Sequence, residues 1–209
     1  MHASGERNRK YGSTATLAVI TAISLLYAAD AAASDFRYLG QARPGKVPEL
    51  FGPGTVSTDD AVEFAPAFAP DGREIYFTRL SLADRTCRIM VMVYVDGEWT
   101  GPEEAPFSGK YMTAEPCFDS SGSILYFSSK RPCRGSSESI PGNIWMVRRD
   151  GSGWSRPVEL PQCVNTAARE GHPCVSSAGN LYFHRGGKDA DIFVAIRDGD
   201  GFAEPVRLG

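Results

Sequence analysis

The sequence predicts an all-β fold made of one repeated unit, and three observations support this. An extended run, a tight turn and a second extended run occur three times, as Glu63–Arg79, Glu115–Arg131 and Glu170–Arg185. A further apolar run follows each copy, and a Trp-x-x-Pro or Phe-x-x-Pro landmark closes each unit. Each unit therefore holds four short strands, and four-stranded units that repeat at about 40–50 residues are typical of β-propeller blades. We expect about three blades, which make a partial or open propeller.

The first strand of each unit contains a proline, at Pro66, Pro116 and Pro173. Proline has no N–H for a sheet ladder, so we expect each of these residues to open its strand. A pair such as Asp71-Gly72 then closes the first hairpin, because glycine accepts a positive φ. We expect Gly72→Val to destabilise the chain more than Gly109→Val, since Gly109 lies in a linker.

The second strand of each unit is apolar on both faces. It comprises Ile75–Phe77, Ile124–Phe127 and Leu181–Phe183. This pattern is typical of a strand buried between two neighbouring sheets rather than one that is wetted on one side.

The chain resembles a known family at this point. The pattern P-x-F-S-P-D-G-x-x-L-Y-F-x-S-x-R, followed by D-I-W and W-x-x-P, is similar to the TolB-type, WD-repeat-like β-propeller repeat of exported bacterial proteins. Here it reads Pro66-Ala-Phe-Ala-Pro-Asp71-Gly72 and then Tyr76-Phe77-Thr-Arg79, and the likeness covers roughly residues 47–209. The third copy departs from the pattern, because its turn is one residue shorter and lacks Asp. The resemblance implies a propeller that serves as a binding module or as an appendage of an enzyme.

The N-terminal segment has the features of a secretory signal peptide. Basic residues up to Lys10 precede an uncharged run whose apolar centre is Leu17–Tyr27, and Ala29–Ala33 offers A-x-A cleavage sites. The alternative is a retained membrane anchor, but the apolar centre is shorter than the ~20 residues that span a bilayer. We therefore expect a periplasmic or secreted protein with no membrane span after cleavage. The expected segments are a signal peptide (1–33), a lead-in with a possible closing strand (34–62) and three blades (63–107, 115–160 and 170–208).

An arc of three blades leaves two apolar flanks. Closed propellers typically have four to eight blades. The outer faces of the first and third blades are therefore expected to lack a partner, and such apolar faces mark an interface. Either the chain is a truncated family member, or it closes by self-association.

Five cysteines lie in the predicted mature region, and an exported chain can oxidise them. Cys117 and Cys174 hold the same repeat position on adjacent inner strands, where we expect them to lie too far apart for a disulfide. Cys133 and Cys163 fall in loops and are freer to pair. With no C-x-x-C motif and three histidines, the sequence predicts no metal site and no cofactor.

Acidic and basic side chains recur at matching ends of the hairpin strands. Hairpin geometry brings these ends together near the central channel, where a polar ligand site is predicted. The candidate residues are Glu63, Arg79, Glu115, Arg131, Glu170, His172 and Arg185. The alternative is that each Glu–Arg pair is a structural bridge within its own blade. Likewise, Trp99, Trp145 and Trp154 could bind sugar rings or serve in packing.

Composition and motifs restrict the function. A net charge of −3 argues against a nucleic-acid partner, and the sequence has no G-x-S-x-G, H-E-x-x-H or phosphate-loop motif. The sequence favours an exported, non-catalytic scaffold that binds a protein, a ligand or a cell-envelope component. The alternative is a glycoside-cleaving propeller, which needs a carboxylate pair from Glu63, Asp119 and Glu170, or the propeller of a serine peptidase, which needs a separate α/β domain.

Overall fold

The computed structural model describes residues 38–42, 45–133 and 140–209. The chain separates into two compact units, Met1–Arg43 and Pro44–Gly209. In the first unit, residues 38–42 form one turn, in which the Gln41 amide donates to the Tyr38 carbonyl at 2.9 Å. The predicted signal peptide, residues 1–33, lies outside the described residues. Within the described ranges, no helix is both long and apolar enough to span a membrane.

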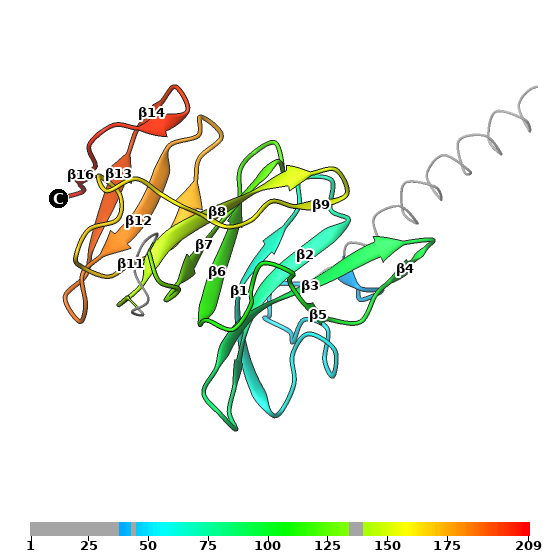
Figure 1. Cartoon of the computed structure of the whole chain (residues 1–209). Coiled ribbons are helices and arrows are strands. Elements are labelled where there is room, and N and C mark those ends of the chain that lie inside the picture. Colours follow the sequence, from blue (N-terminus) through cyan, green and yellow to red (C-terminus); the bar gives the residue numbers. More distant parts are fainter. Residues whose placement is uncertain (1–37, 43–44, 134–139) are drawn as a thin grey trace, which may run out of the picture. The chain divides into compact units, whose positions relative to one another are not determined.

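The second unit begins with a lead-in and a first antiparallel sheet, blade 1 (Figure 1). Its three long strands are β1 (Ala61–Phe68), β2 (Glu74–Ser81) and β3 (Cys87–Val95). The fourth strand is split in two, because β4 (Glu98–Trp99) pairs with the end of β3 and β5 (Glu103–Glu104) pairs with its middle.

Blade 2 repeats this arrangement. β6 (Thr113–Phe118), β7 (Ile124–Ser129) and β8 (Asn143–Asp150) form the sheet. The short strands β9 (Gly153–Trp154) and β10 (Val158–Glu159) both pair with β8.

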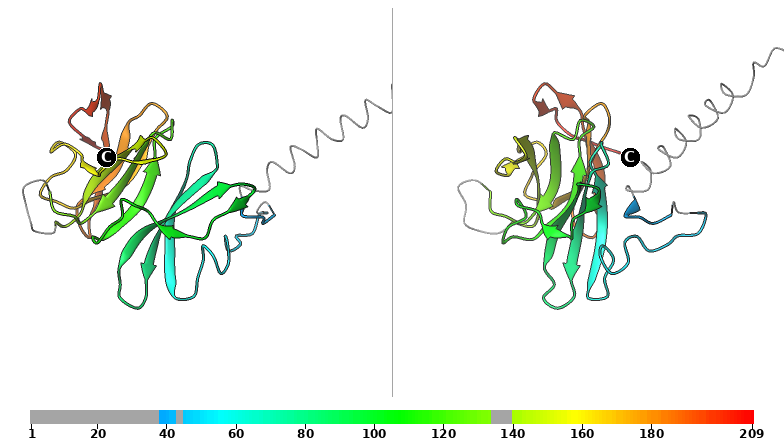
Figure 2. Two further views of the ribbon diagram at one scale, coloured as in Figure 1. Left: turned by 45° about the vertical axis from the view of Figure 1, so that its right-hand side comes forward. Right: turned by 90° about the vertical axis from the view of Figure 1, so that its right-hand side faces the viewer.

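Blade 3 has the strand order β11-β12-β13-β16. Its members are β11 (Glu170–Val175), β12 (Leu181–Arg185), β13 (Asp191–Ala195) and β16 (Val206–Arg207). A separate small hairpin, formed by β14 (Arg197–Asp198) and β15 (Gly201–Phe202), lies between the last two. The innermost strands β1, β6 and β11 contact one another in turn, so the three sheets stand side by side as blades of a partial propeller (Figure 2). The predicted all-β fold with four-stranded blades is confirmed.

The hydrophobic core lies between successive blades. Tyr76 of blade 1 packs against Phe118 and Phe127 of blade 2 in one buried cluster, and Tyr126 of blade 2 packs against Leu181 and Phe183 of blade 3 in another. In each case the tyrosine of the Tyr-Phe pair faces the next blade, and the phenylalanine faces the previous one, since neighbouring residues of a strand point to opposite faces.

The prediction of two bare flanks is wrong for blade 1. Its outward-facing Ile75 and Phe77 are 0% and 1% exposed. The lead-in lies against this blade, because the Phe51 ring contacts Phe68 edge-on and the carbonyl of buried Val56 bonds to Arg79. Residues 45–60 form no strand, only an isolated bridge between Pro53 and Ser57, so in this described stretch the lead-in covers the flank as a loop and not as a closing strand.

Blade 3 keeps its outward face bare. Tyr182 is 36% exposed, whereas its counterparts Tyr76 and Tyr126 are 3% and 2% exposed. Residues that pair directly across neighbouring strands point to the same side of a sheet, and the pairing of β11, β12, β13 and β16 places several other apolar side chains on the face of Tyr182. We call this surface the open face, and it is formed by Cys174, Tyr182, Ile192, Val194, Val206 and Leu208.

The hairpin glycines adopt the predicted backbone. Gly72, Gly122 and Gly179 have φ values of 73°, 72° and 83°. Gly109 also has a positive φ, 66°, so its linker position does not free it from strain, and the expected contrast between Gly72 and Gly109 loses its basis. Gly101 is the better control, because it lacks a positive φ and has nothing within 4 Å of an added Cβ.

Candidate functional site

A β-bulge shapes the inner strand of every blade. The pairing with the second strand slips by one residue at Pro66, Pro116 and Pro173. These prolines therefore lie within their strands and do not open them, because the bulge leaves one residue outside the ladder and removes the need for an N–H there. The residue before each proline has a positive φ, which is uncommon for residues other than glycine. These residues are Ala65, Glu115 and His172, with φ values of 50°, 62° and 51°.

The glutamate and arginine of blade 3 form a buried clamp. Arg185 Nε donates to Glu170 Oε1 at 3.0 Å, and Arg185 Nη2 donates to the carbonyls of Cys163 and Val164, both at 2.9 Å. Glu170 is fully buried, and Thr166 Oγ1 donates to the same Oε1. The clamp ties the crossover from blade 2 to the first hairpin of blade 3.

Blade 1 contains the same clamp. Arg79 Nε lies 2.8 Å from Glu63 Oε1, and Arg79 Nη2 donates to the carbonyls of Thr55 and Val56 in the lead-in, both at 3.0 Å. Each guanidinium also stands over the phenylalanine of its own Tyr-Phe pair, with 5.4 Å between Arg79 and the Phe77 centroid. These contacts favour the interpretation of the pairs as structural bridges.

Blade 2 builds the clamp without a glutamate. Arg131 Nη2 donates to the carbonyls of Phe107 and Ser108 at 2.8 and 3.2 Å, and its Nε donates to Ser129 Oγ. Thr113 takes the place of the acid and lies 3.4 Å from Nη2. Burial lowers the pKa of Arg131 to about 10, so the guanidinium is still charged at neutral pH. Glu115 is thus released from the clamp.

Glu115 turns instead towards blade 3. Its Oε2 accepts hydrogen bonds from the His172 amide at 2.7 Å and from Ser128 Oγ, and its Oε1 lies 3.2 Å from His172 Nε2. His172 Nδ1 in turn lies 2.8 Å from His184 Nδ1. The Glu115 side chain is 8% exposed, whereas the His172 side chain is 60% exposed. We call Ser128, Glu115, His172 and His184 the inner-edge cluster.

The inner-edge cluster depends on a close approach of the backbone. A Cβ on Gly171 would lie 2.9 Å from His184 Cε1, 3.0 Å from Glu115 Oε2 and 3.2 Å from Ser128 Oγ. Only glycine leaves room for the carboxylate to reach across the blades.

The sequence prediction names two members of this cluster, Glu115 and His172, and misses Ser128 and His184. The missed residues follow the Tyr-Phe pairs directly, as does Thr78 in blade 1, whose Oγ1 accepts a hydrogen bond from the Glu115 amide at 2.8 Å. This shared position is a sequence signal that could have found them. Burial, followed by the nearby His172, lowers the pKa of His184, so its ring is neutral at pH 7.

Asp119 and Glu170 do not converge into the carboxylate pair that a glycosidase would need. Asp119 accepts from the Ile124 amide in the hairpin turn at the far end of β6. Glu170 lies at the start of β11, opposite the start of β6 in the repeat. The length of strand between the start of β6 and Asp119 is six residues, which separates Asp119 from Glu170 by roughly 20 Å at 3.3 Å per residue. The two carboxylates of a glycosidase lie about 5–9.5 Å apart.

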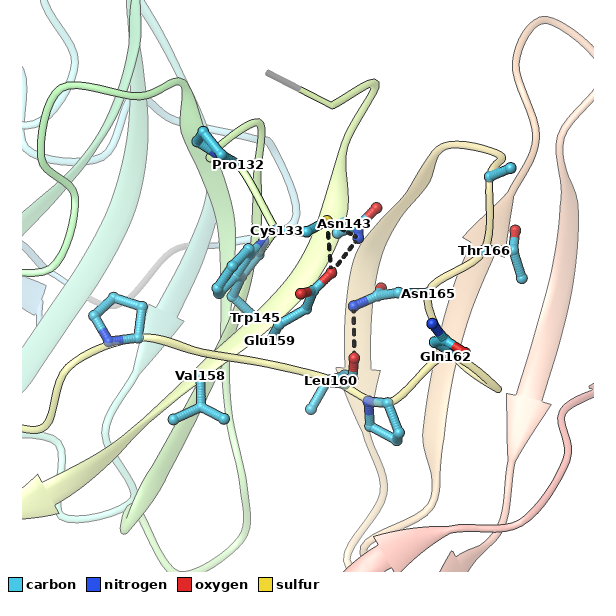
Figure 3. A pocket seen from close by; sticks show the side chains of 13 residues that line it. Pro132, Cys133, Asn143, Trp145, Val158, Glu159, Leu160, Gln162, Asn165 and Thr166 are labelled. Atoms are coloured by element: carbon cyan, nitrogen blue, oxygen red, sulfur yellow. Dashed lines mark hydrogen bonds between the residues drawn. The ribbon is translucent and has the colours of Figure 1, made fainter. Parts of the chain in front are cut away.

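A hollow of about 980 Å³ lies on blade 2 beside the crossover to blade 3 (Figure 3). Within it, Cys133 Sγ and Asn143 Nδ2 both donate to Glu159 Oε1, at 2.9 and 2.7 Å. Burial and the hydrogen bond to Glu159 raise the pKa of the Cys133 thiol to about 11. The indole Nε1 of Trp145, which also lines the hollow, has no hydrogen-bond partner in the described part of the chain.

The other landmark side chains serve in packing. Trp154 reaches back from blade 2 and donates from Nε1 to the Tyr76 hydroxyl at 2.9 Å, while Trp99 lies against Tyr94. All five cysteines are free thiols. Burial raises the pKa of the Cys117 thiol, and the Cys174 side chain adds to the rise. Among the residues with described placement, no group of three or more His, Cys, Asp or Glu side chains is arranged to hold a metal ion.

Comparisons with known proteins give likeness of fold only. No family model matches the chain, and no curated protein matches it. Among solved structures, it is similar to TolB from Acinetobacter baumannii, with 21% identity, a TM-score of 0.46, and coverage of 69% of this chain and 31% of that one.

Two further likenesses are to proteins named as enzymes. One is a candidate 6-phosphogluconolactonase from Bacteroides uniformis ATCC 8492 (17% identity, TM-score 0.40, 75% of this chain and 44% of that one). The other is an ulvan lyase of polysaccharide lyase family PL25 (16% identity, TM-score 0.37, 71% and 40%). The chain spans less than half the length of each of these three structures. Its assignment as a partial propeller therefore rests on its own strand topology.

Proposed function

We propose that the chain is an exported, non-catalytic β-propeller module that binds a protein partner in the cell envelope, and that the open face of blade 3 is its docking surface. One observation supports this above all. The open face is the repeat counterpart of the two surfaces that are buried between blades, yet it stands bare.

The repeat also indicates what the partner looks like. Tyr76 packs on a Phe- and Leu-bearing sheet face of blade 2, and Tyr126 packs on a similar face of blade 3. A partner that fits around Tyr182 therefore offers a β-sheet with an aromatic and aliphatic face. Burial of such apolar area contributes about 25 cal/mol per Å² to the free energy of binding.

The polar residues near the channel favour binding over hydrolysis. Glu63 and Glu170 are engaged by Arg79 and Arg185 in clamps, and Asp119 lies in a distant turn. Asp119 and Glu170 are therefore too far apart for a glycosidase pair.

The docking proposal is tested with lysine substitutions on the open face. Ile192→Lys and Val206→Lys change residues that are 57% and 62% exposed, so both variants should fold. Val95→Lys is the matched control, because Val95 is 53% exposed and lies at the end of β3 in blade 1. The wild type and the control should bind the dye ANS at the bare face. Both should also gain mass by light scattering as concentration rises, because a second copy offers the same kind of apolar sheet face as the partner. Both signals should fall in the two open-face variants. Equal signals in all four proteins would refute the docking surface.

Export is tested separately. The signal-peptide features predict that secreted material begins near Ala32 or Ser34. N-terminal sequencing of the exported protein checks this, and Met1 intact on a membrane-bound protein would contradict it.

A further inference from the structure

We propose that His172 and His184 bind a divalent transition-metal ion, such as Zn²⁺ or Ni²⁺, with Glu115 as the carboxylate that orients the first imidazole. The site lies at the inner edge of blade 3, next to blade 2, where His184 pairs across the strands with Ile192 at the border of the open face. It uses other side chains than the docking proposal, and its test measures metal binding alone. It also departs from the expectation of the sequence, which predicted no metal.

The spacing of the two imidazoles suits a metal ion. His172 Nδ1 and His184 Nδ1 face each other at 2.8 Å, with ring centroids 4.7 Å apart. Two nitrogens that each lie about 2.0–2.1 Å from one zinc ion are separated by about 2.9 Å at a right angle and about 3.3 Å in a tetrahedron. The distance between the two nitrogens therefore needs to grow by only a few tenths of an ångström, while both rings rotate so that their lone pairs point at the ion instead of along the hydrogen bond.

Glu115 selects the nitrogen that is free to bind. Its Oε1 lies 3.2 Å from His172 Nε2, which places the ring proton on Nε2 and leaves a lone pair on Nδ1. Metal-binding histidines usually donate their other N–H to a carboxylate in this way, which fixes the ring and raises its basicity. Glu115 is itself held by Ser128 Oγ and by the His172 amide, so the carboxylate is already in place before any ion arrives.

The remaining coordination positions are open to solvent. The His172 side chain is 60% exposed, so water molecules can complete the shell around two protein ligands. In the present arrangement His184 Nδ1 carries the proton that is shared with His172 Nδ1. Metal binding replaces that proton, which moves to His184 Nε2 or to solvent, and no electron transfer is involved.

The test is calorimetric titration of the tag-free full-length chain with ZnCl₂ and NiCl₂. We expect one ion per chain. His172→Ala and His184→Ser should each weaken binding by more than tenfold, and Glu115→Gln by roughly 10–100-fold. Cys133→Ser is the control and should leave binding unchanged, since Cys133 lines the hollow of blade 2 and is not part of the inner-edge cluster.

A second measurement separates metal binding from loss of fold. In a ¹⁵N-histidine-labelled chain, ZnCl₂ should shift the Nδ1 resonances of two of the three imidazoles, those that His172→Ala and His184→Ser remove one at a time. The melting temperature of His184→Ser without metal should match that of the wild type, because Ser128 holds the same repeat position in blade 2. Binding that survives both histidine substitutions, binding that is lost in Cys133→Ser, or no binding at millimolar metal would each overturn the proposal.

Discussion

The clamp of blade 3 gives the sharpest test of the structure, through the substitution Arg185→Met. This change removes the partner of Glu170, whose side chain is 0% exposed, and takes a donor from two crossover carbonyls. Removing one member of a buried ion pair costs about 3–5 kcal/mol, because the other charge stays buried without compensation. At about 2–4 °C per kcal/mol for a domain of this size, the melting temperature should fall by about 6–20 °C.

The matched control is Arg207→Met. Arg207 pairs with Asp191, but the two side chains are 64% and 41% exposed. A surface pair contributes about 0–1 kcal/mol, so this variant should melt within a few degrees of the wild type. Urea unfolding followed by circular dichroism gives the free energies independently of the thermal scans.

A double variant tests the mechanism. The double variant Glu170→Gln with Arg185→Met has no buried charge. Its loss of unfolding free energy should therefore be smaller than the sum of the losses of the two single variants, by about 0.5–3 kcal/mol. Equal melting temperatures for Arg185→Met and Arg207→Met, or strictly additive losses in the double variant, would show that the clamp is not a buried charge pair.

Two further outcomes follow from the close contacts. Gly171→Ala should lower the melting temperature and weaken zinc binding, because the new Cβ would lie 2.9 Å from the imidazole of His184 and 3.0 Å from the carboxylate of Glu115. Gly101→Ala, which has open space around it, should change neither quantity. A Gly171→Ala variant with unchanged melting temperature and zinc affinity would contradict the geometry. Iodoacetamide should alkylate the exposed thiol of Cys174 well before Cys133 at pH 8, because the pKa of Cys133 is raised to about 11. Glu159→Gln should speed the modification of Cys133, as mass spectrometry of timed samples can show, and an unchanged rate would exclude Glu159 as a cause of the shift.

Much of the fold could be predicted from local chemistry. Turn glycines and the spacing of the Tyr-Phe pairs each act within one hairpin, and Gly72, Tyr76 and Tyr126 occupy the positions that this reasoning assigned. The prolines were harder to place, because Pro116 is tolerated within its strand only through a bulge, and a bulge is a property of the pairing with the neighbouring strand.

The site was harder still, because it joins different blades. The spacing of Glu115 and Arg131 suggested an ion pair, but Thr113 holds the register of the acid in this blade and Glu115 crosses to His172. Which of two neighbouring residues faces the clamp depends on a one-residue slip in the strand, and such a slip reverses the direction of every side chain. His184 could be found only by aligning the positions that follow the Tyr-Phe pairs.

The lead-in of blade 1 has a consequence for symmetry. Because residues 51–57 lie against the first flank, the two ends of the arc present different surfaces, one covered and one bare. Head-to-tail contacts between copies, which would propagate into rings or filaments, are therefore blocked at one end. Pairing of two copies open face to open face would be isologous, with a two-fold axis, and would stop at two. Loosening the lead-in would convert this self-limiting surface into one that can polymerise.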